Sequence, residues 1–146
     1  MRNILLLISM LGLLPAGCGR TVSDTDTVSC DTFVYSVKGG DSLRLDRYTD
    51  TPAAEIDAKK PCMIFVFGGA FISGTRDAES YRPFFEYMAR EQGYTVVSID
   101  YRLGLKEPLA AGKLSPETFP QLLPQTVLMA VEDLYDCLLY TSDAAD

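Results

Sequence analysis

The chain has 146 residues, of which 47% are hydrophobic and 23% charged, and this is enough apolar material for the core of one ordinary domain. Its net charge of -7 argues against nucleic-acid binding, because proteins that bind nucleic acids present a basic face to the phosphates. The sequence has no histidine, so it contains neither a complete Ser-His-Asp triad nor a histidine-ligated metal site. We expect no cofactor and no metal.

The first 17 residues have the pattern of an export signal, with Arg2 before an apolar run over residues 4–14 and small residues before Cys18. The run is shorter than the roughly 20 residues that a membrane-spanning helix needs. Its end, Leu-Pro-Ala-Gly-Cys, resembles a bacterial lipobox, in which the cysteine becomes lipid-modified. We therefore expect an exported lipoprotein, periplasmic or on the cell surface, with membrane anchoring through lipid on Cys18 and a polar tether over residues 18–31. Ordinary signal cleavage and secretion is the alternative.

The middle of the chain predicts a hairpin followed by a strand, a helix and a strand. Residues 32–37 and 43–48 are strand-like and flank the turn signal Lys-Gly-Gly-Asp. The continuous apolar run over 62–67 is typical of a strand buried on both faces, and residues 95–100 predict a second buried strand. Between these runs, Pro83 and the apolar spacing that follows it predict a helix, which Gly93 ends.

The last third of the natural sequence predicts an irregular connection and a final helix. Prolines interrupt residues 101–120 at Pro108, Pro116 and Pro120. The helix that follows has an apolar stripe of Leu123, Val127, Ala130, Val131 and Leu134, with Glu132, Asp133 and Asp136 outside it. An antiparallel hairpin that leads into alternating strands and helices implies a parallel sheet with crossover helices, and hence an α/β fold.

Residues 137–146 read Cys-Leu-Leu-Tyr-Thr-Ser-Asp-Ala-Ala-Asp, which matches a translation of the transposase end and adapter used to prepare sequencing libraries. We interpret them as adapter read-through, the alternative being a natural helix end with an acidic tail. Different synonymous codons in the nucleotide sequence would exclude the adapter. On this interpretation the natural domain covers residues 32–136.

Two further cysteines, Cys30 at the end of the tether and Cys62 in the domain, could form a disulfide in an exported protein if the first strand lies near the third. Two free, buried thiols are the alternative.

Residues 33–136 resemble the N-terminal part of an α/β-hydrolase of the carboxylesterase and lipase type, cut off before the nucleophile strand. The resemblance rests on three segments in the family's order. Residues 67–71, Phe-Gly-Gly-Ala-Phe, are similar to the oxyanion loop usually written His-Gly-Gly-Gly or His-Gly-Gly-Ala. Residues 96–104, Val-Val-Ser-Ile-Asp-Tyr-Arg-Leu-Gly, resemble the end of the fourth strand, and 130–134, Ala-Val-Glu-Asp-Leu, the helix before the nucleophile.

For the site, the resemblance implies that the N–H groups of Gly69 and Ala70 are oxyanion-hole donors, with Gly68 and Phe67 supporting the loop. Phe67 stands where the family usually has histidine. A tight strand-to-helix turn without a catalytic role is the alternative. For Asp100 and Arg102 we expect structural hydrogen bonds or ion pairs, and for the Arg76-Asp77 pair a solvated turn.

For function, the resemblance implies an exported carboxylic-ester hydrolase that acts on small-molecule esters with a Ser-His-Asp/Glu triad. The sequence has no Gly-x-Ser-x-Gly, and the triad follows in the order Ser, Asp/Glu, His in this fold, so all three residues are expected beyond Asp136. The chain itself is then inactive. The alternatives are a serine peptidase or deacetylase of the same fold, and a non-catalytic binding lipoprotein.

Overall fold

A computed structural model describes residues 27–51 and 60–143 of the chain. The predicted export signal and Cys18 lie outside these residues. The strands are β1 (Ser29–Lys38), β2 (Asp41–Thr49), β3 (Cys62–Val66) and β4 (Thr95–Ile99), and the helices are α1 (Arg82–Arg90), α2 (Lys106–Ala110) and α3 (Phe119–Asp143). β1 begins inside the predicted tether, because Ser29 already pairs with Thr49 of β2.

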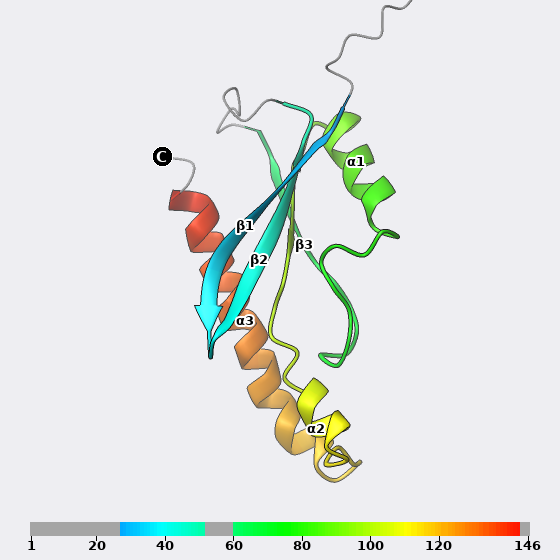
Figure 1. Cartoon of the computed structure of the whole chain (residues 1–146), viewed down its shortest axis with the longest axis vertical. Coiled ribbons are helices and arrows are strands. Elements are labelled where there is room, and N and C mark those ends of the chain that lie inside the picture. Colours follow the sequence, from blue (N-terminus) through cyan, green and yellow to red (C-terminus); the bar gives the residue numbers. More distant parts are fainter. Residues whose placement is uncertain (1–26, 52–59, 144–146) are drawn as a thin grey trace, which may run out of the picture.

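The strands form one mixed sheet in the order β1-β2-β4-β3 (Figure 1). β1 and β2 make the predicted antiparallel hairpin, and Gly39 and Gly40 both have positive φ, as a tight hairpin turn of this kind requires. β4 pairs antiparallel with β2 and parallel with β3, and α1 makes the crossover between β3 and β4. The α/β class and the order of the elements are therefore confirmed.

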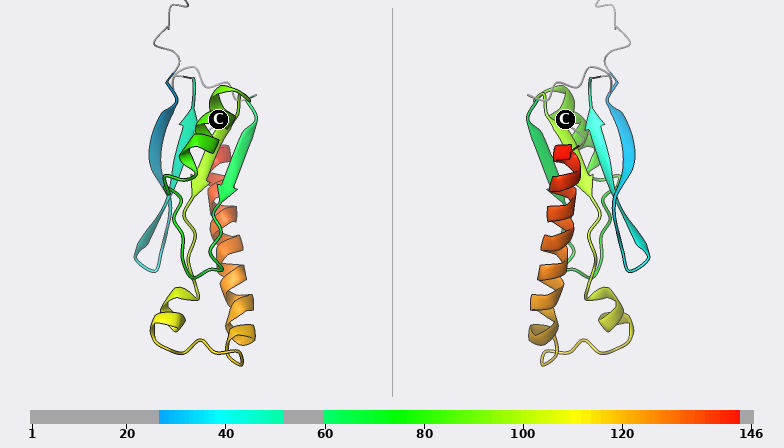
Figure 2. Two further views of the ribbon diagram at one scale, coloured as in Figure 1. Left: turned by 90° about the vertical axis from the view of Figure 1, so that its right-hand side faces the viewer. Right: turned by 90° about the vertical axis from the view of Figure 1, so that its left-hand side faces the viewer.

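Helices cover both faces of the sheet (Figure 2). On the face of α1, Phe85 packs with Tyr48 and Val96, while on the face of α3 the core contains Val97 and Ile99 of β4. Successive residues of β4 thus alternate between two apolar cores, which is why Val96 and Val97 are both buried although they face opposite sides of the sheet. β3 was predicted to be buried on both faces, but among the described strands it pairs with β4 alone and it is only partly covered.

The cysteine pairing that we considered is wrong. Cys30 lies in β1 and Cys62 in β3, at opposite edges of the sheet, with β2 and β4 between them. Both thiols are free, as the alternative predicted, but both cysteines are exposed and not buried. A disulfide requires Cα atoms about 4.4–6.8 Å apart, and two intervening strands place these cysteines well beyond that distance.

The long connection after β4 contains more helix than expected. Pro108 lies within the short helix α2, and Pro120 lies in the first turn of α3 rather than in a loop. A proline in the first turn of a helix is tolerated, because the N–H group that it lacks would have no partner inside the helix. No described helix is both long and apolar enough to cross a membrane.

The predicted core stripe of α3 is wrong at several positions. Asp133 is fully buried, whereas Val127 and Val131, which we expected in the core, are 38% and 55% exposed. The reason is a contact far away in the sequence: the carboxylate of Asp133 accepts hydrogen bonds from the backbone N–H and the guanidinium of Arg102, which turns this side of the helix inward. Several apolar side chains are left on the surface of α3, namely Val127, Leu128, Val131, Tyr135, Leu138 and Leu139.

α3 continues beyond Asp136 to Asp143, and Cys137 is fully buried in the core on that face of the sheet. Whether residues 137–146 are adapter read-through stays a prediction for the nucleotide sequence. Burial raises the pKa of the Cys137 thiol to about 11, and the charge of nearby Cys62 acts in the same direction. The pKa of a cysteine thiol in an unfolded chain is about 8.5. Between this value and the folded pKa, the thiolate forms more readily in the unfolded state than in the folded state.

We therefore expect the stabilising contribution of Cys137 to be complete below about pH 8.5 and to fall as the pH rises towards the folded pKa. The measurement is the free energy of unfolding in urea near pH 8 and near pH 10.5, for the chain and for Cys137→Ala. The alanine variant should lose less stability between the two pH values. Burial also raises the pKa of Tyr48, which contributes to both proteins alike. The pKa of Tyr35 is raised chiefly by burial but also by the charge of Cys137, so a small part of the difference between the two proteins comes from Tyr35. Equal losses would contradict the prediction.

Candidate active site

A glycine-rich loop, residues 67–75, leaves the carboxyl end of β3 and turns back before α1. Its tightest point is Gly69, whose carbonyl accepts hydrogen bonds from the N–H groups of Ile72 and Ser73 at 3.0 and 3.2 Å. Gly69 has a φ of 144°, and a Cβ atom at this position would lie 1.8 Å from the carbonyl oxygen of Ser73. Only glycine fits this turn without moving the backbone.

The next two residues of the loop have strained backbones. Ala70 and Phe71 have φ values of 54° and 60°, in the left-handed region that side chains other than glycine seldom adopt. Each such residue costs about 1–2 kcal/mol. The carbonyl of Phe71 accepts a hydrogen bond of 3.1 Å from the N–H of Leu105, next to α2. The surrounding structure therefore holds this segment in a conformation that it would otherwise avoid.

The amide groups of this turn are open to solvent. Gly68, Gly69 and Ala70 are exposed. Within residues 27–51 and 60–143, the N–H groups of Gly69 and Ala70 donate no hydrogen bond to the protein. A Cβ atom at Gly68 would meet nothing within 4 Å, so the approach to these amides is also open on that side. Two adjacent donors are thus available to an acceptor outside the loop.

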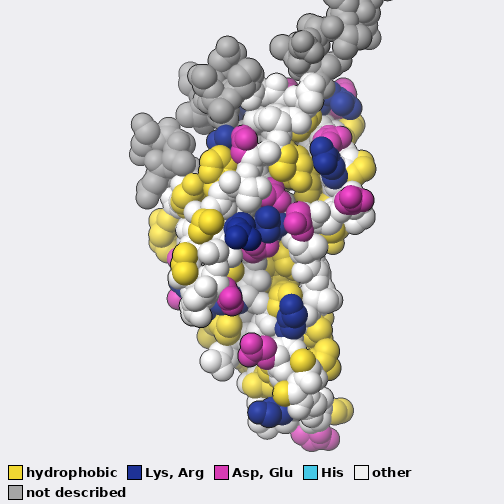
Figure 3. Space-filling model, viewed as in Figure 1, with side chains coloured by type: hydrophobic (Ala, Val, Ile, Leu, Met, Phe, Trp, Pro, Cys, Tyr) yellow, Lys and Arg dark blue, Asp and Glu magenta, His cyan; other side chains and the backbone are white. Residues whose placement is uncertain are grey.

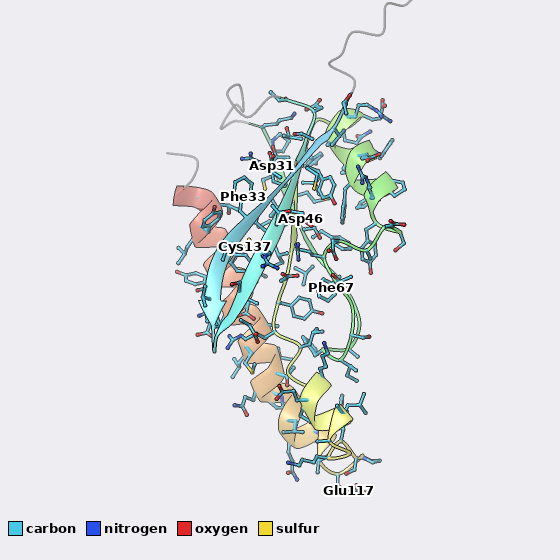
Figure 4. The ribbon with its side chains drawn as sticks, viewed as in Figure 1. Asp31, Phe33, Asp46, Phe67, Glu117 and Cys137 are labelled. Carbon is cyan, nitrogen blue, oxygen red and sulfur yellow. The ribbon has the colours of Figure 1, made fainter. Side chains whose placement is uncertain are left out.

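Phe67 occupies the base of the loop and is 4% exposed (Figure 4). Its ring lies 4.5 Å from the ring of Tyr101, centroid to centroid, and its carbonyl accepts a buried hydrogen bond of 2.8 Å from the Tyr101 hydroxyl. Gly74 passes close to the same ring, since a Cβ atom at Gly74 would come within 2.5 Å of it. Packing and one hydrogen bond fix the position of Phe67.

Replacing Tyr101 with phenylalanine should lower the free energy of unfolding by about 1–2 kcal/mol, because the carbonyl of Phe67 loses its buried donor. Tyr87→Phe is the matched control: its hydroxyl accepts a hydrogen bond from Gln92 at the surface, where water replaces the lost partner. Urea unfolding of both variants checks the prediction, which fails if the two changes cost the same.

The far end of the loop is held by Arg76, for which we expected a solvated turn. That prediction is wrong for Arg76, whose side chain is 13% exposed. Its Nη1 donates to both carboxylate oxygens of Asp100, at 3.0 and 3.1 Å, and its Nε lies 3.1 Å from the carboxylate of Asp46. Burial lowers the pKa of the guanidinium, but the hydrogen bonds and charges of Asp100 and Asp46 outweigh it and raise that pKa. Asp77, in contrast, is exposed as expected.

Asp100 and Arg102 have the structural roles that the sequence suggested. The carboxylate of Asp100 accepts a hydrogen bond of 3.1 Å from the N–H of Arg44 in addition to its pair with Arg76. Arg102 donates to Asp133 from its Nε at 2.9 Å and from its backbone N–H at 2.8 Å. Both residues tie the carboxyl end of β4 to neighbouring elements.

An open cavity of about 610 Å³ lies beside the loop, between the hairpin turn, the end of β4 and α2. Phe67, Gly74 and Thr75 form the part of its wall that belongs to the loop, and Asp41, Asp100, Arg102, Lys106 and Glu107 supply charges of both signs. On the face shown in Figure 3, basic side chains likewise lie beside acidic ones and form no extended basic patch. The acidic and basic side chains of the cavity lining therefore nearly balance, and its net charge is small.

The chain matches the family described as "Carboxylesterase family" over residues 16–109, which include the whole glycine-rich loop and β4. Non-reducing polyketide synthase trt4 of Aspergillus terreus is 34% identical over 100 residues, which make up 68% of this chain and 4% of that protein. Probable N-octanoylanthranilate hydrolase AqdA2 of Rhodococcus erythropolis is 36% identical over 83 residues, or 57% of this chain and 18% of that protein.

Among solved structures, Thermogutta terrifontis esterase 2 phosphorylated by paraoxon is 30% identical, with a TM-score of 0.43, over 51% of this chain and 27% of that chain. The chain spans less than a fifth of the length of each of the two curated relatives, the polyketide synthase and the hydrolase. The family match, however, covers more than half of the present chain. The chain belongs to the carboxylesterase family.

Proposed function

We propose that this chain is the N-terminal part of an exported carboxylic-ester hydrolase and that residues 67–71 form its oxyanion loop. The observation that carries the proposal is the pair of exposed N–H groups of Gly69 and Ala70, which have no partner among the described residues and lie in a strained, firmly held turn. Membership of the carboxylesterase family supports the reaction class.

The chemistry of ester hydrolysis explains what such a turn does. Attack on the ester carbonyl produces a tetrahedral oxyanion, which is stabilised by N–H donors about 2.7–3.1 Å from the negative oxygen. Gly69 and Ala70 supply two donors, and the residue after the nucleophile supplies the third. Donors fixed before the reaction need no reorganisation when the charge develops, so a rigid turn is an advantage. Phe67 and Gly68 support the loop, with Phe67 anchored on Tyr101 where the family usually has histidine.

The proposal places the nucleophile, the acid and the base in sequence that follows Asp136, since the chain has no histidine and no Gly-x-Ser-x-Gly. Export is part of the proposal and rests on residues 1–17 and Cys18, with a lipid anchor on that cysteine. Palmitate labelling of the full precursor, with Cys18→Ala as control, tests the anchor. Absence of label from the unmodified precursor would exclude it.

The function is tested by extending the gene beyond codon 136 and assaying the full-length protein with p-nitrophenyl acetate. We expect Gly-x-Ser-x-Gly within the next few tens of residues, and turnover that is lost when its serine is replaced by alanine. An intact motif without turnover would count against a simple esterase. Absence of the motif would instead support the non-catalytic binding lipoprotein.

A second candidate is amide hydrolysis, which the name of one relative favours. The name N-octanoylanthranilate hydrolase denotes cleavage of an N-acyl bond in the Rhodococcus erythropolis protein. The same oxyanion donors serve both reactions, because both pass through a tetrahedral intermediate. Parallel assays with p-nitrophenyl acetate and p-nitroacetanilide distinguish the two. A higher kcat/KM for the anilide would favour the amidase, peptidase or deacetylase class.

A further inference from the structure

We propose that Arg76 is a positioning residue for the oxyanion loop: it joins the carboxyl end of the loop to two strands of the sheet and thereby holds the Gly69 and Ala70 donors in place. The inference rests on the proposed function of the loop. It concerns a contact between the loop and the sheet, and Arg76 itself touches no reacting atom.

The guanidinium of Arg76 connects three separate parts of the fold. It lies between Asp46 of β2 and Asp100, the residue after β4, with side-chain exposures of 13% for Arg76, 4% for Asp46 and 24% for Asp100. The contact with Asp100 uses both carboxylate oxygens. The contact with Asp46 is an ion pair without hydrogen-bond geometry, since the buried Nε has no hydrogen-bond partner among the described residues. The hydrogen bonds to Asp100 orient the guanidinium, and the charge of Asp46 attracts it from the side of β2.

Both carboxylates are themselves held by other strands. The hydroxyl of Thr32 in β1 donates to Asp46 at 2.6 Å, and the backbone N–H of Arg44 in β2 donates to Asp100 at 3.1 Å. Arg76 therefore contacts groups that are already fixed by the hairpin and by β4. This is the arrangement expected of a rigid support, in which the supporting groups have hydrogen bonds of their own.

The backbone of Arg76 is fixed as well. The hydroxyl of Ser98, a fully buried residue of β4, donates a hydrogen bond of 2.8 Å to the Arg76 carbonyl. At its other end the loop is held by the bond from Tyr101 to the carbonyl of Phe67. Between these two attachments lie Ala70 and Phe71 in left-handed conformations, which persist only when the surrounding structure imposes them. Loosening either attachment lets the turn relax and moves the donors.

The test compares the full-length protein with two variants, Arg76→Lys and Ser98→Ala. The serine substitution is the smaller change, and it tests the same attachment if Arg76→Lys fails to fold. Lysine keeps the charge but cannot engage both carboxylates in the same way. Arg82→Lys is the matched control, since Arg82 pairs with Glu86 on the exposed side of α1. For each protein we would measure kcat and KM with p-nitrophenyl acetate, the Ki of a trifluoromethyl ketone, the amount of nucleophile titrated by a phosphonate, and the urea midpoint.

We expect Arg76→Lys to lower kcat about 10-fold and Ser98→Ala about 3-fold, because a displacement of well under 1 Å already weakens an oriented catalytic contact. KM should change less than about 2-fold, while the Ki of the ketone, whose adduct carries an oxyanion, should rise in proportion to the loss in kcat. Arg82→Lys should match the unmodified protein.

Variants that lose stability but keep kcat and the ketone Ki would overturn the inference and leave the esterase proposal standing. An unmodified protein with neither turnover nor a titratable nucleophile would overturn both, so the two failures are distinguishable. Titration of the nucleophile shows that each variant is compared per folded active site.

Discussion

Replacing Gly69 with alanine is expected to lower the kcat of the full-length enzyme by at least about 100-fold, the loss typical of removing one oxyanion donor. The reason is steric. The new Cβ atom would lie 1.8 Å from the carbonyl oxygen of Ser73, so the turn must open and the N–H groups of residues 69 and 70 must move. The measurement is kcat with p-nitrophenyl acetate, normalised to the nucleophile titrated by a phosphonate.

Gly93→Ala is the matched control for this change. Gly93 also has a positive φ, 72°, but a Cβ atom there would meet nothing within 4 Å. The substitution should therefore cost about 1 kcal/mol of stability through backbone strain alone and leave kcat unchanged. If both alanine variants kept full activity, the turn at Gly69 would have no catalytic role and the strand-to-helix turn would be the better interpretation.

Removing the carboxylate of Asp133 should have the largest effect on stability. Asp133→Ala leaves the backbone N–H and the Nε of Arg102 without the acceptors that lie 2.8 and 2.9 Å away. Asp133 is fully buried, and breaking a buried ion pair by removing one partner costs about 3–5 kcal/mol. The lower end of this range applies, because the Arg102 side chain is 23% exposed and water can reach part of it. The free energy of unfolding in urea measures the effect.

Glu132→Gln is the control, since Glu132 pairs with the same Arg102 but is 56% exposed. Surface ion pairs of this kind contribute little, because water already solvates both charges. We expect an unfolding free energy close to that of the unmodified protein. Equal losses in the two variants would show that burial of Asp133 is not what stabilises the contact between α3 and β4.

The sequence predicted the parts of the fold that depend on local patterns. Alternation in β2 and the double glycine at Gly39 and Gly40 identified the hairpin, and the mostly β-branched sequence of β4 indicated a buried strand. Each of these patterns reflects neighbours within a few residues or one face of one strand. The glycine-rich loop was identified by its residue types and their order, which do not report the left-handed backbone of Ala70 and Phe71.

The parts that sequence analysis missed depend on distant partners. Arg76 reads as a polar loop residue, and its partners are 30 residues earlier at Asp46 and 24 residues later at Asp100. Helical periodicity predicts a solvated position for Asp133, because a carboxylate is assigned to the polar face of the helix. Its burial is favourable because Arg102, 31 residues away, donates a hydrogen bond to it. In both cases an arginine follows a segment of the candidate site: Arg76 follows the glycine-rich loop, and Arg102 follows the carboxyl end of β4. Hydrophobic periodicity does not report which carboxylate pairs with such an arginine.

The order of the strands in the sheet was also not predicted from the sequence. β3 and β4 both contain apolar runs, but among the described strands β4 pairs with two neighbours and β3 with one. Sequence patterns report which faces of a strand are apolar and say nothing about its position in the sheet. That is why the pairing of Cys30 with Cys62 was a reasonable hypothesis and is nevertheless wrong.

The most direct test of the oxyanion loop is a crystal structure of the full-length protein after reaction of its nucleophile with a phosphonate, whose phosphoryl oxygen occupies the position of the oxyanion. We predict that the backbone nitrogen atoms of Gly69 and Ala70 lie about 2.7–3.1 Å from that oxygen. A phosphoryl oxygen held by other donors, with both of these nitrogen atoms beyond hydrogen-bond distance, would contradict the assignment of the loop.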